Sequence, residues 1–154
     1  MKNYHLGGLV AFLQRSEAAF HTRRLKSTHI NYGQFTFLMT LYFEDGINQE
    51  TIARRLFLNK ATVARSIEKL EREGYVYRVQ DEKDGRANRV FLAPKARELE
   101  PEITRAVEEW NGVLIAGLTD VETLVAKELL KKMVANAFHE MGEDDLVLPA
   151  GMKE

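Results

Sequence analysis

Basic and hydroxyl side chains recur on one face of the helix predicted for residues 60–73. The helical spacing of Val63, Ile67 and Leu70 turns these apolar residues inward and leaves a polar face outward. The side chains on that face are Lys60, Ala61, Thr62, Arg65, Ser66 and Lys69. The major groove of B-DNA admits one α-helix, and its base edges bond to Lys, Arg, Ser and Thr side chains. The pattern predicts a DNA-reading helix that enters by its N-terminal end, with a solvated mixed-charge helix as the alternative.

A second candidate site is the run Asp84-Gly85-Arg86 in a polar stretch between two β-rich segments. Gly85 permits a bend, and the Asp84 carboxylate, two residues before Arg86, can hold the guanidinium extended. An arginine presented in this way suits the narrow, electronegative minor groove of DNA. Taken alone, either residue could equally belong to a solvated loop.

Other kinds of site find little support in the residue types. The chain has no cysteine, which excludes disulfide bonds, thiolate metal clusters and thiol-based redox sensing. His5, His21, His29 and His139 lack the spacing of a metal site, so no metal is expected, although a site formed across a dimer stays open. The sequence contains neither a phosphate loop nor a nucleophile or dinucleotide motif. We therefore expect no enzyme activity and no cofactor.

The candidate reading helix belongs to a helix-turn-helix. Asn48 is a suitable N-cap for a short helix over residues 49–57, and Asn59 is a suitable N-cap for the helix over 60–73. Gly74 then supplies the residue best suited to a left-handed C-terminal cap. Two helices joined by two or three residues, the second with a cationic outer face, are typical of helix-turn-helix motifs.

The residues that follow alternate as strands do. Residues 75–79 and 89–92 are β-branched and aromatic, and they flank the polar stretch 80–88. The pattern predicts a β-hairpin with a long charged tip, which serves as a wing beside the helix-turn-helix.

Longer helices flank this region. Apolar periodicity predicts helices over residues 5–29, 34–44, 94–117 and from 119 or 120 to 141, followed by a tail over 142–154. The first and last helices carry more apolar surface than one small core can cover, which predicts a partner subunit. The alternative is that both helices pack on their own domain.

Charge is unevenly distributed over the 154 residues, whose net charge is −1. Residues 46–92 contain ten basic and seven acidic side chains, which leaves 12 basic and 16 acidic side chains elsewhere. A mildly basic centre inside an acidic remainder agrees with contact to DNA through the centre. The sequence has no apolar run of membrane-spanning length and no secretion signal, so we expect a cytoplasmic protein that does not enter a membrane.

Residues 48–56 (NQETIARRL), 61–78 (ATVARSIEKLEREGYVYR) and 84–92 (DGRANRVFL) resemble the MarR family of bacterial transcriptional regulators. The resemblance implies a mainly α fold with a small β-hairpin wing, forming one domain over residues 1–154. Residues 34–92 would form the winged helix-turn-helix, and residues 1–30 and 94–141 the flanking dimerisation helices. It also implies a homodimeric repressor or activator, with repression the expected mode, on a palindromic operator of double-stranded DNA. Arg86 then falls on the minor-groove position of the wing, with Asp84 as its orienting partner.

The same resemblance implies an effector, because proteins of this family are often released from DNA by small aromatic or phenolic anions. The candidate ligand-binding residues are Arg15, His21, Phe35, Tyr42 and Trp110. Aromatic residues at helical spacing are also common in an ordinary core. From a different class of function, the alternative to DNA binding is a winged-helix adaptor that binds protein through its acidic termini.

Overall fold

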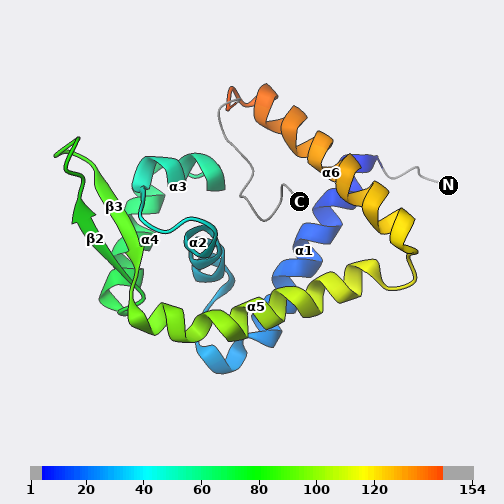
Figure 1. Ribbon diagram of the computed structural model, residues 1–154, viewed down its shortest axis with the longest axis horizontal. Coiled ribbons are helices and arrows are strands. Elements are labelled where there is room, and N and C mark those ends of the chain that lie inside the picture. Colours follow the sequence, from blue (N-terminus) through cyan, green and yellow to red (C-terminus); the bar gives the residue numbers. More distant parts are fainter. Residues whose placement is uncertain (1–4, 144–154) are drawn as a thin grey trace.

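The computed structural model describes residues 5–143 of the chain, so the predicted tail lies outside the described residues from position 144 onward. The helices are α1 (Leu6–Arg24), the 3-10 turn η1 (Lys26–Thr28), α2 (Tyr32–Phe43), α3 (Gln49–Leu56), α4 (Lys60–Arg72), α5 (Pro94–Ile115) and α6 (Asp120–Glu140). The strands are β1 (Ile47–Asn48), β2 (Val76–Gln80) and β3 (Asn88–Leu92). The predicted fold class, mainly α with a small β-hairpin wing, is confirmed (Figure 1).

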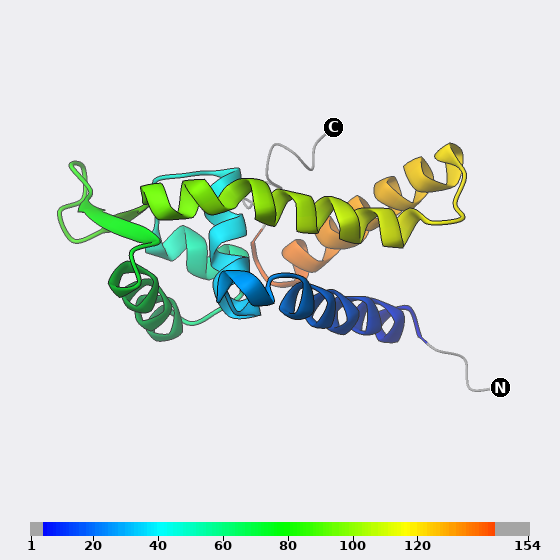
Figure 2. The same ribbon diagram turned by 90° about the horizontal axis from the view of Figure 1, so that it is seen from below.

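The molecule is elongated, with the hairpin at one end. The N-terminal ends of α1 and α6 and the C-terminal end of α5 lie at the other end (Figures 1 and 2). α5 runs between these ends and continues β3 into the helical arm. None of the helices in residues 5–143 combines the length and the apolar character that a membrane span requires.

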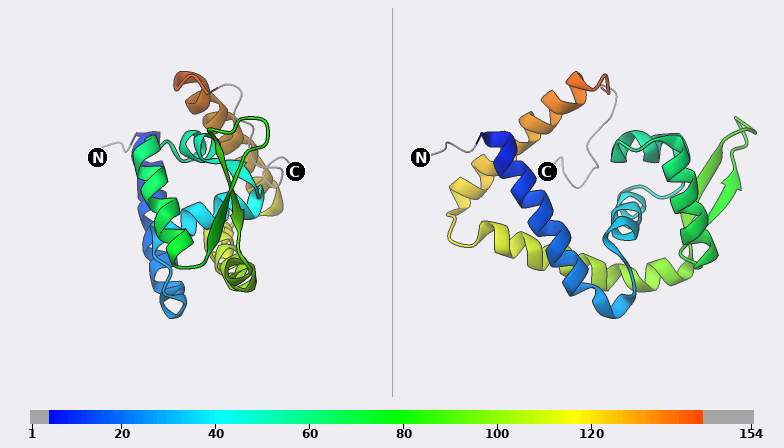
Figure 3. Two further views of the ribbon diagram at one scale, coloured as in Figure 1. Left: turned by 90° about the vertical axis from the view of Figure 1, so that its left-hand side faces the viewer. Right: turned by 180° about the vertical axis from the view of Figure 1, so that it is seen from behind.

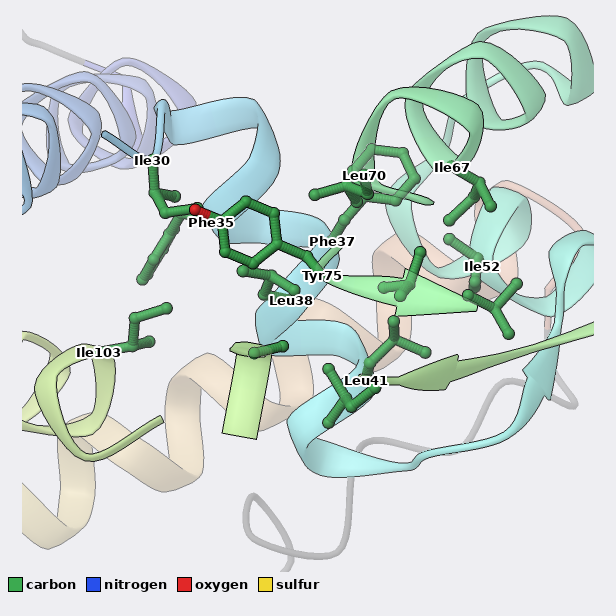
Figure 4. Close-up of a cluster of buried hydrophobic side chains, with 14 of the residues drawn as sticks. Ile30, Phe35, Phe37, Leu38, Leu41, Ile52, Ile67, Leu70, Tyr75 and Ile103 are labelled. Carbon is green, nitrogen blue, oxygen red and sulfur yellow. The ribbon is translucent and has the colours of Figure 1, made fainter. Parts of the chain in front are cut away.

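The core is built around α2, which passes between the winged part and the arm (Figure 4). Its residues Leu38 and Leu41 are fully buried. They pack in one cluster with apolar side chains from every part of the winged region and from the first half of α5, among them Ile52, Val63, Ile67, Leu70, Val90, Leu92 and Ile103. Burying each such side chain contributes roughly 1.5–3 kcal/mol, so the winged region and α5 are held as one unit.

The hairpin is part of a three-stranded antiparallel sheet, which sequence reasoning did not predict. β1 pairs with β3 through Ile47 and Val90, and β2 pairs with β3 through Val76 and Leu92. Two residues are too few to produce an alternating pattern, so β1 left no signal in the sequence. The strand ties the start of α3 to the wing.

The first helix is shorter in the structure than the range 5–29 that the sequence predicted. α1 ends at Arg24, after which Leu25 is buried, the chain makes the turn η1, and His29 adopts a left-handed conformation with φ of 59°. The apolar spacing continues past residue 24 because Leu25 and Ile30 both enter the core. The apolar periodicity therefore predicted a helix that continues through residues 26–28, where the structure has the turn η1.

α6 stands apart from the core. Thr119 caps its N-terminus with a side chain that accepts a hydrogen bond from the backbone N–H of Glu122, and the helix buries none of its residues. Val121 and Leu124 are 70% and 61% exposed. Further large apolar side chains are exposed on α1 and at the end of α5, including Leu6, Leu9, Phe12, Leu13, Val113 and Ile115. The described residues leave these apolar faces uncovered, as is typical of surfaces that bind another protein.

Gly46→Ala tests the junction between α2 and the sheet. Gly46 has φ of +72°, and a Cβ atom there would overlap Cε1 of Phe91. We expect the substitution to lower the free energy of unfolding by roughly 2–4 kcal/mol, measured by urea denaturation, because backbone strain and overpacking add. Gly74→Ala is the matched control, since Gly74 also has positive φ but its nearest neighbour, Cδ of Lys95, lies 3.9 Å from the added atom. Equal losses in the two variants would contradict the role of Phe91.

Candidate nucleic-acid interface

The turn of the helix-turn-helix is built from local hydrogen bonds. Asn48 Oδ1 accepts from the backbone N–H of Thr51, and Asn59 Oδ1 accepts from that of Thr62, each at 2.8 Å. Both predicted N-caps are therefore confirmed. Between the helices, Phe57 adopts a left-handed conformation with φ of 51°, and the Leu58 N–H donates to the Ala53 carbonyl. These contacts end α3 and begin α4 within three residues.

The two sides of α4 differ as the spacing predicted. Val63, Ile67 and Leu70 are buried, whereas Ala61, Arg65 and Lys69 are exposed. The Lys60 side chain is 79% exposed, and Thr62 and Ser66 are half-buried on the same helix. The predicted reading residues thus lie outside the core, in the first three turns of α4.

Glu50 is a neighbour of this face that sequence reasoning missed. Its Oε1 atom lies 3.0 Å from Nζ of Lys60, and both side chains are largely exposed. An exposed ion pair of this kind contributes little to stability, so Lys60 can exchange Glu50 for another anion at small cost. The only sequence signal was that Glu50 and Lys60 lie in the first turns of adjacent helices.

A second ion pair fastens the wing to α4. The Arg78 guanidinium on β2 donates from Nη2 and Nε to Oε2 of Glu71, at 2.6 and 3.0 Å, and the Arg78 backbone N–H donates to Oε1 at 3.1 Å. The hydrogen bonds from Arg78 hold the pKa of the Glu71 carboxyl below its ordinary value. Seen from the wing end, α4 and the hairpin lie side by side (Figure 3, left).

The tip of the wing is organised by its own carboxylates. Asp81 Oδ1 accepts from the backbone N–H groups of Lys83 and Asp84, at 2.8 and 3.2 Å, and these bonds lower the pKa of Asp81. Asp84 Oδ1 accepts from the backbone N–H of Arg86 at 3.1 Å. The expected contact between Asp84 and the Arg86 guanidinium is therefore not formed. The Asp84 carboxylate instead accepts from the backbone amide of Arg86, which is closer along the chain than the guanidinium, and this hydrogen bond shapes the turn.

Arg86 itself is exposed, and no ion pair joins it to any residue within 5–143. Lys83, which we did not predict as a site residue, is also exposed at the tip. Both side chains border a hollow of about 440 Å³ between the wing and the start of α3, where Asn48 and Gln49 form the opposite wall. The wing tip and the helix-turn-helix thus form one continuous polar surface.

The five candidate ligand residues do not meet at one place. Phe35 and Trp110 line a cavity between α1, α2 and α5. Tyr42 donates its hydroxyl to the Ala96 carbonyl at 2.6 Å, and burial raises its pKa. His21 is buried and stacks on Phe35 with ring centroids 4.4 Å apart. Arg15 lies over the ring of Phe12, 4.7 Å from its centroid.

No group of three or more His, Asp or Glu side chains in the described part of the chain is arranged to hold a metal ion.

Taken together, a capped helix-turn-helix, an exposed cationic helix face and a sheet with an extended tip define a winged helix-turn-helix protein. The model of the MarR family matches residues 30–87. A MarR transcriptional regulator from Methanosarcina mazei Go1 is 39% identical, with a TM-score of 0.82 over 87% of this chain and 96% of that one. The chain belongs to the MarR family and is a transcriptional regulator of that type.

Further relatives agree with this assignment. A MarR protein from Peptoclostridium difficile DA00132 is 30% identical, with a TM-score of 0.82 over 91% of this chain and 93% of that one. The uncharacterized HTH-type transcriptional regulator YybA of Bacillus subtilis is 26% identical over 82% of this chain and 85% of its own length. The matched proteins are transcriptional regulators, a class without enzyme activity, as the sequence predicted.

Glu71→Gln tests the ion pair that fastens the wing. Because the folded-state pKa of Glu71 is depressed, its stabilisation is present above the ordinary carboxyl pKa of 4.5 and is lost as the pH falls through the folded-state value. Since the pair is about one-third exposed, we expect the variant to lose only about 1 kcal/mol of unfolding free energy at neutral pH. Urea denaturation across acid pH should show the difference from wild type shrinking. Glu82→Gln, at the exposed wing tip, should change nothing; a pH-independent loss in Glu71→Gln would contradict the assignment.

Proposed function

We propose that this regulator binds double-stranded DNA sequence-specifically as a homodimer and represses transcription by occupying a palindromic operator. The observation that carries the proposal is that Arg65 on α4 and Arg86 on the wing are both exposed, and no ion pair joins either to a residue within 5–143. The Glu71–Arg78 pair fixes the spacing of the elements that carry them. Arginines held at a set spacing without a protein partner are suited to two neighbouring grooves.

In this proposal α4 reads the major groove with Lys60, Ala61, Thr62, Arg65, Ser66 and Lys69. The helix enters by its N-terminal end, because the acidic side chains Glu68 and Glu71 lie in its C-terminal half and Glu73 is its C-cap, where phosphates would be repelled. Lys60 leaves Glu50 for a phosphate, and the exposed Ala61 allows close approach to the bases. Arg65 and Ser66 occupy positions from which base edges are reached.

The wing reads the adjacent minor groove with Arg86. Three backbone hydrogen bonds to Asp81 and Asp84 hold the tip in one conformation, which lowers the entropy lost when the arginine is inserted. Asp84 contributes by shaping the turn. The neighbouring Lys83 supplies a further positive charge to the phosphates that border the groove.

The exposed apolar faces of α1, α6 and the end of α5 support a homodimer, with residues 1–30 and 94–141 supplying the dimerisation helices. A helix of 21 residues that buries none of them gains little stability from its own chain. A twofold axis through these arms would place two copies of α4 on half-sites one helical turn apart, about 10 base pairs. A small aromatic molecule in the cavity beside Phe35 and Trp110 would act between the arms and the reading surface.

Arg65→Ala and Arg86→Ala test the DNA contacts. A site is first selected from a random duplex pool, and affinity is then measured by fluorescence anisotropy over a range of salt concentrations. Each variant should lose about 1–3 kcal/mol of binding free energy, and Arg65→Ala should also relax the base preference. Lys26→Ala, an exposed cation on η1, is the control and should bind like wild type. Wild-type binding that ignores salt, or that survives both arginine substitutions, would favour the protein-adaptor alternative.

Leu124→Glu tests the dimer. Leu124 is 61% exposed on α6, so a buried charge appears only if a second copy covers it. We expect sedimentation velocity at micromolar concentration to give a dimer for wild type and a monomer for the variant. Lys83→Glu, an exposed charge reversal at the wing tip outside the dimerisation helices, should remain dimeric. A monomeric wild type, or a dimeric Leu124→Glu, would refute the interface.

A further inference from the structure

The cavity between α1, α2 and α5 has a composition that suits one class of ligand. Its volume is about 600 Å³, and the aromatic rings of Tyr32, Phe35, Phe43 and Trp110 line it. Trp110 is held from behind by Phe20, whose ring centroid lies 5.3 Å away. The walls are therefore largely apolar and aromatic, as in sites for small organic molecules.

Glu17 on α1 is the one charged residue among the described residues that line this cavity. Two arginines on the same helix as Glu17 have other contacts. Arg15 stacks on Phe12, and Arg24 donates to Glu109 on α5, with Nη2 and Oε1 3.0 Å apart. The walls thus hold a carboxylate and aromatic faces, with no lysine, arginine or histidine among the described lining residues.

His21 does not neutralise this carboxylate. Its Nε2 atom is 3.8 Å from Oε1 of Glu17, beyond hydrogen-bond distance, and its side chain is 1% exposed behind Phe35. Burial lowers the pKa of His21, so the imidazole is neutral at neutral pH. Burial also raises the pKa of Glu17, which agrees with a carboxylate that no ionised base offsets among residues 5–143.

We propose that this cavity binds amphiphilic organic cations, in which an apolar body carries an ammonium group. The ammonium lies against the Glu17 carboxylate and the faces of the neighbouring rings, where cation–π attraction adds to the ion pair. The body occupies the apolar space between Phe35 and Trp110. The proposal names the ligand class for the ligand regulation proposed above, and it rests on that regulation for its biological role. Binding of the cation to the cavity is itself measured without DNA.

This ligand class differs from the aromatic anion expected from the sequence. Arg15 and His21, the two basic residues among the candidate ligand-binding residues, do not line the cavity. An anion entering it would meet the Glu17 carboxylate with no compensating cation among the described lining residues, so repulsion between like charges would oppose its binding. Another possible occupant is a side chain of a second copy, because Leu114 belongs both to the cavity wall and to the exposed apolar end of α5.

The experiment compares two ligands of the same shape and opposite charge on the full-length chain. They are 3-phenylpropyltrimethylammonium and 4-phenylbutanoate, with 3-phenylpropanol as the neutral reference. Trp110 is the single tryptophan of the chain, so its fluorescence reports occupancy of this cavity directly. We expect the cation to bind about tenfold more tightly than the anion, with the alcohol between them, which is the effect of about one favourable charge contact.

Glu17→Gln should abolish the preference for the cation while the alcohol binds as before. Glu98→Gln, which removes an exposed carboxylate from the far part of α5, is the matched control and should retain the preference. Equal or tighter binding of the anion by wild type would overturn the proposal, as would a preference that survives Glu17→Gln. Failure of all three ligands to change the fluorescence would also overturn it and would indicate that a second copy fills the cavity. None of these outcomes depends on whether DNA is bound.

Discussion

The geometry of the reading surface depends on the ion pair between Glu71 and Arg78. It is the only side-chain ion pair among the described residues that joins α4 to the sheet, and a third hydrogen bond from the Arg78 backbone adds direction to it. Without it, α4 and the wing would be related by the short connection through Gly74, by the hydrogen bond from the Tyr75 N–H to the Leu70 carbonyl and by apolar packing. Apolar packing resists separation better than sliding. Because two grooves of DNA must be met at once, a fixed spacing saves conformational entropy on binding.

The chain divides into a part that buries its apolar side chains in its own core and a part that leaves them exposed. The winged region and the first half of α5 share one core around Leu38 and Leu41. α6 and the outer turns of α1 and α5 expose apolar faces instead. The winged region is therefore stabilised by its own core. The stability of α6 and the outer turns of α1 and α5 depends instead on whatever covers their apolar faces. The burial that stabilises the winged region is therefore separate from the apolar surface that the proposed homodimer would cover.

The cavity lies where these two parts meet. Its walls come from α2, which is central to the core, and from α1 and α5, which continue into the arms (Figures 1 and 2). A molecule bound there would contact both parts together, and a change in their relative position would change its affinity. By linkage, its binding would then bias that position. Glu17 places a negative charge at this junction, and charge is the property by which the two parts could select a ligand.

Local sequence determined much of this protein. The caps Asn48 and Asn59, the left-handed Gly74 and the spacing of Val63, Ile67 and Leu70 specify the helix-turn-helix through contacts within a few residues, so they could be recognised without a fold. Tertiary structure alone decided the pairing of β1, the Glu71–Arg78 ion pair, the contact of Asp84 with a backbone amide and the exclusion of Arg15 and His21 from the cavity wall. These depend on distances across turns and between separate elements, and residue spacing along a chain carries no record of them. Charge in the cavity is the clearest case, because the same arginine can line a pocket or face solvent after a small rotation of its helix.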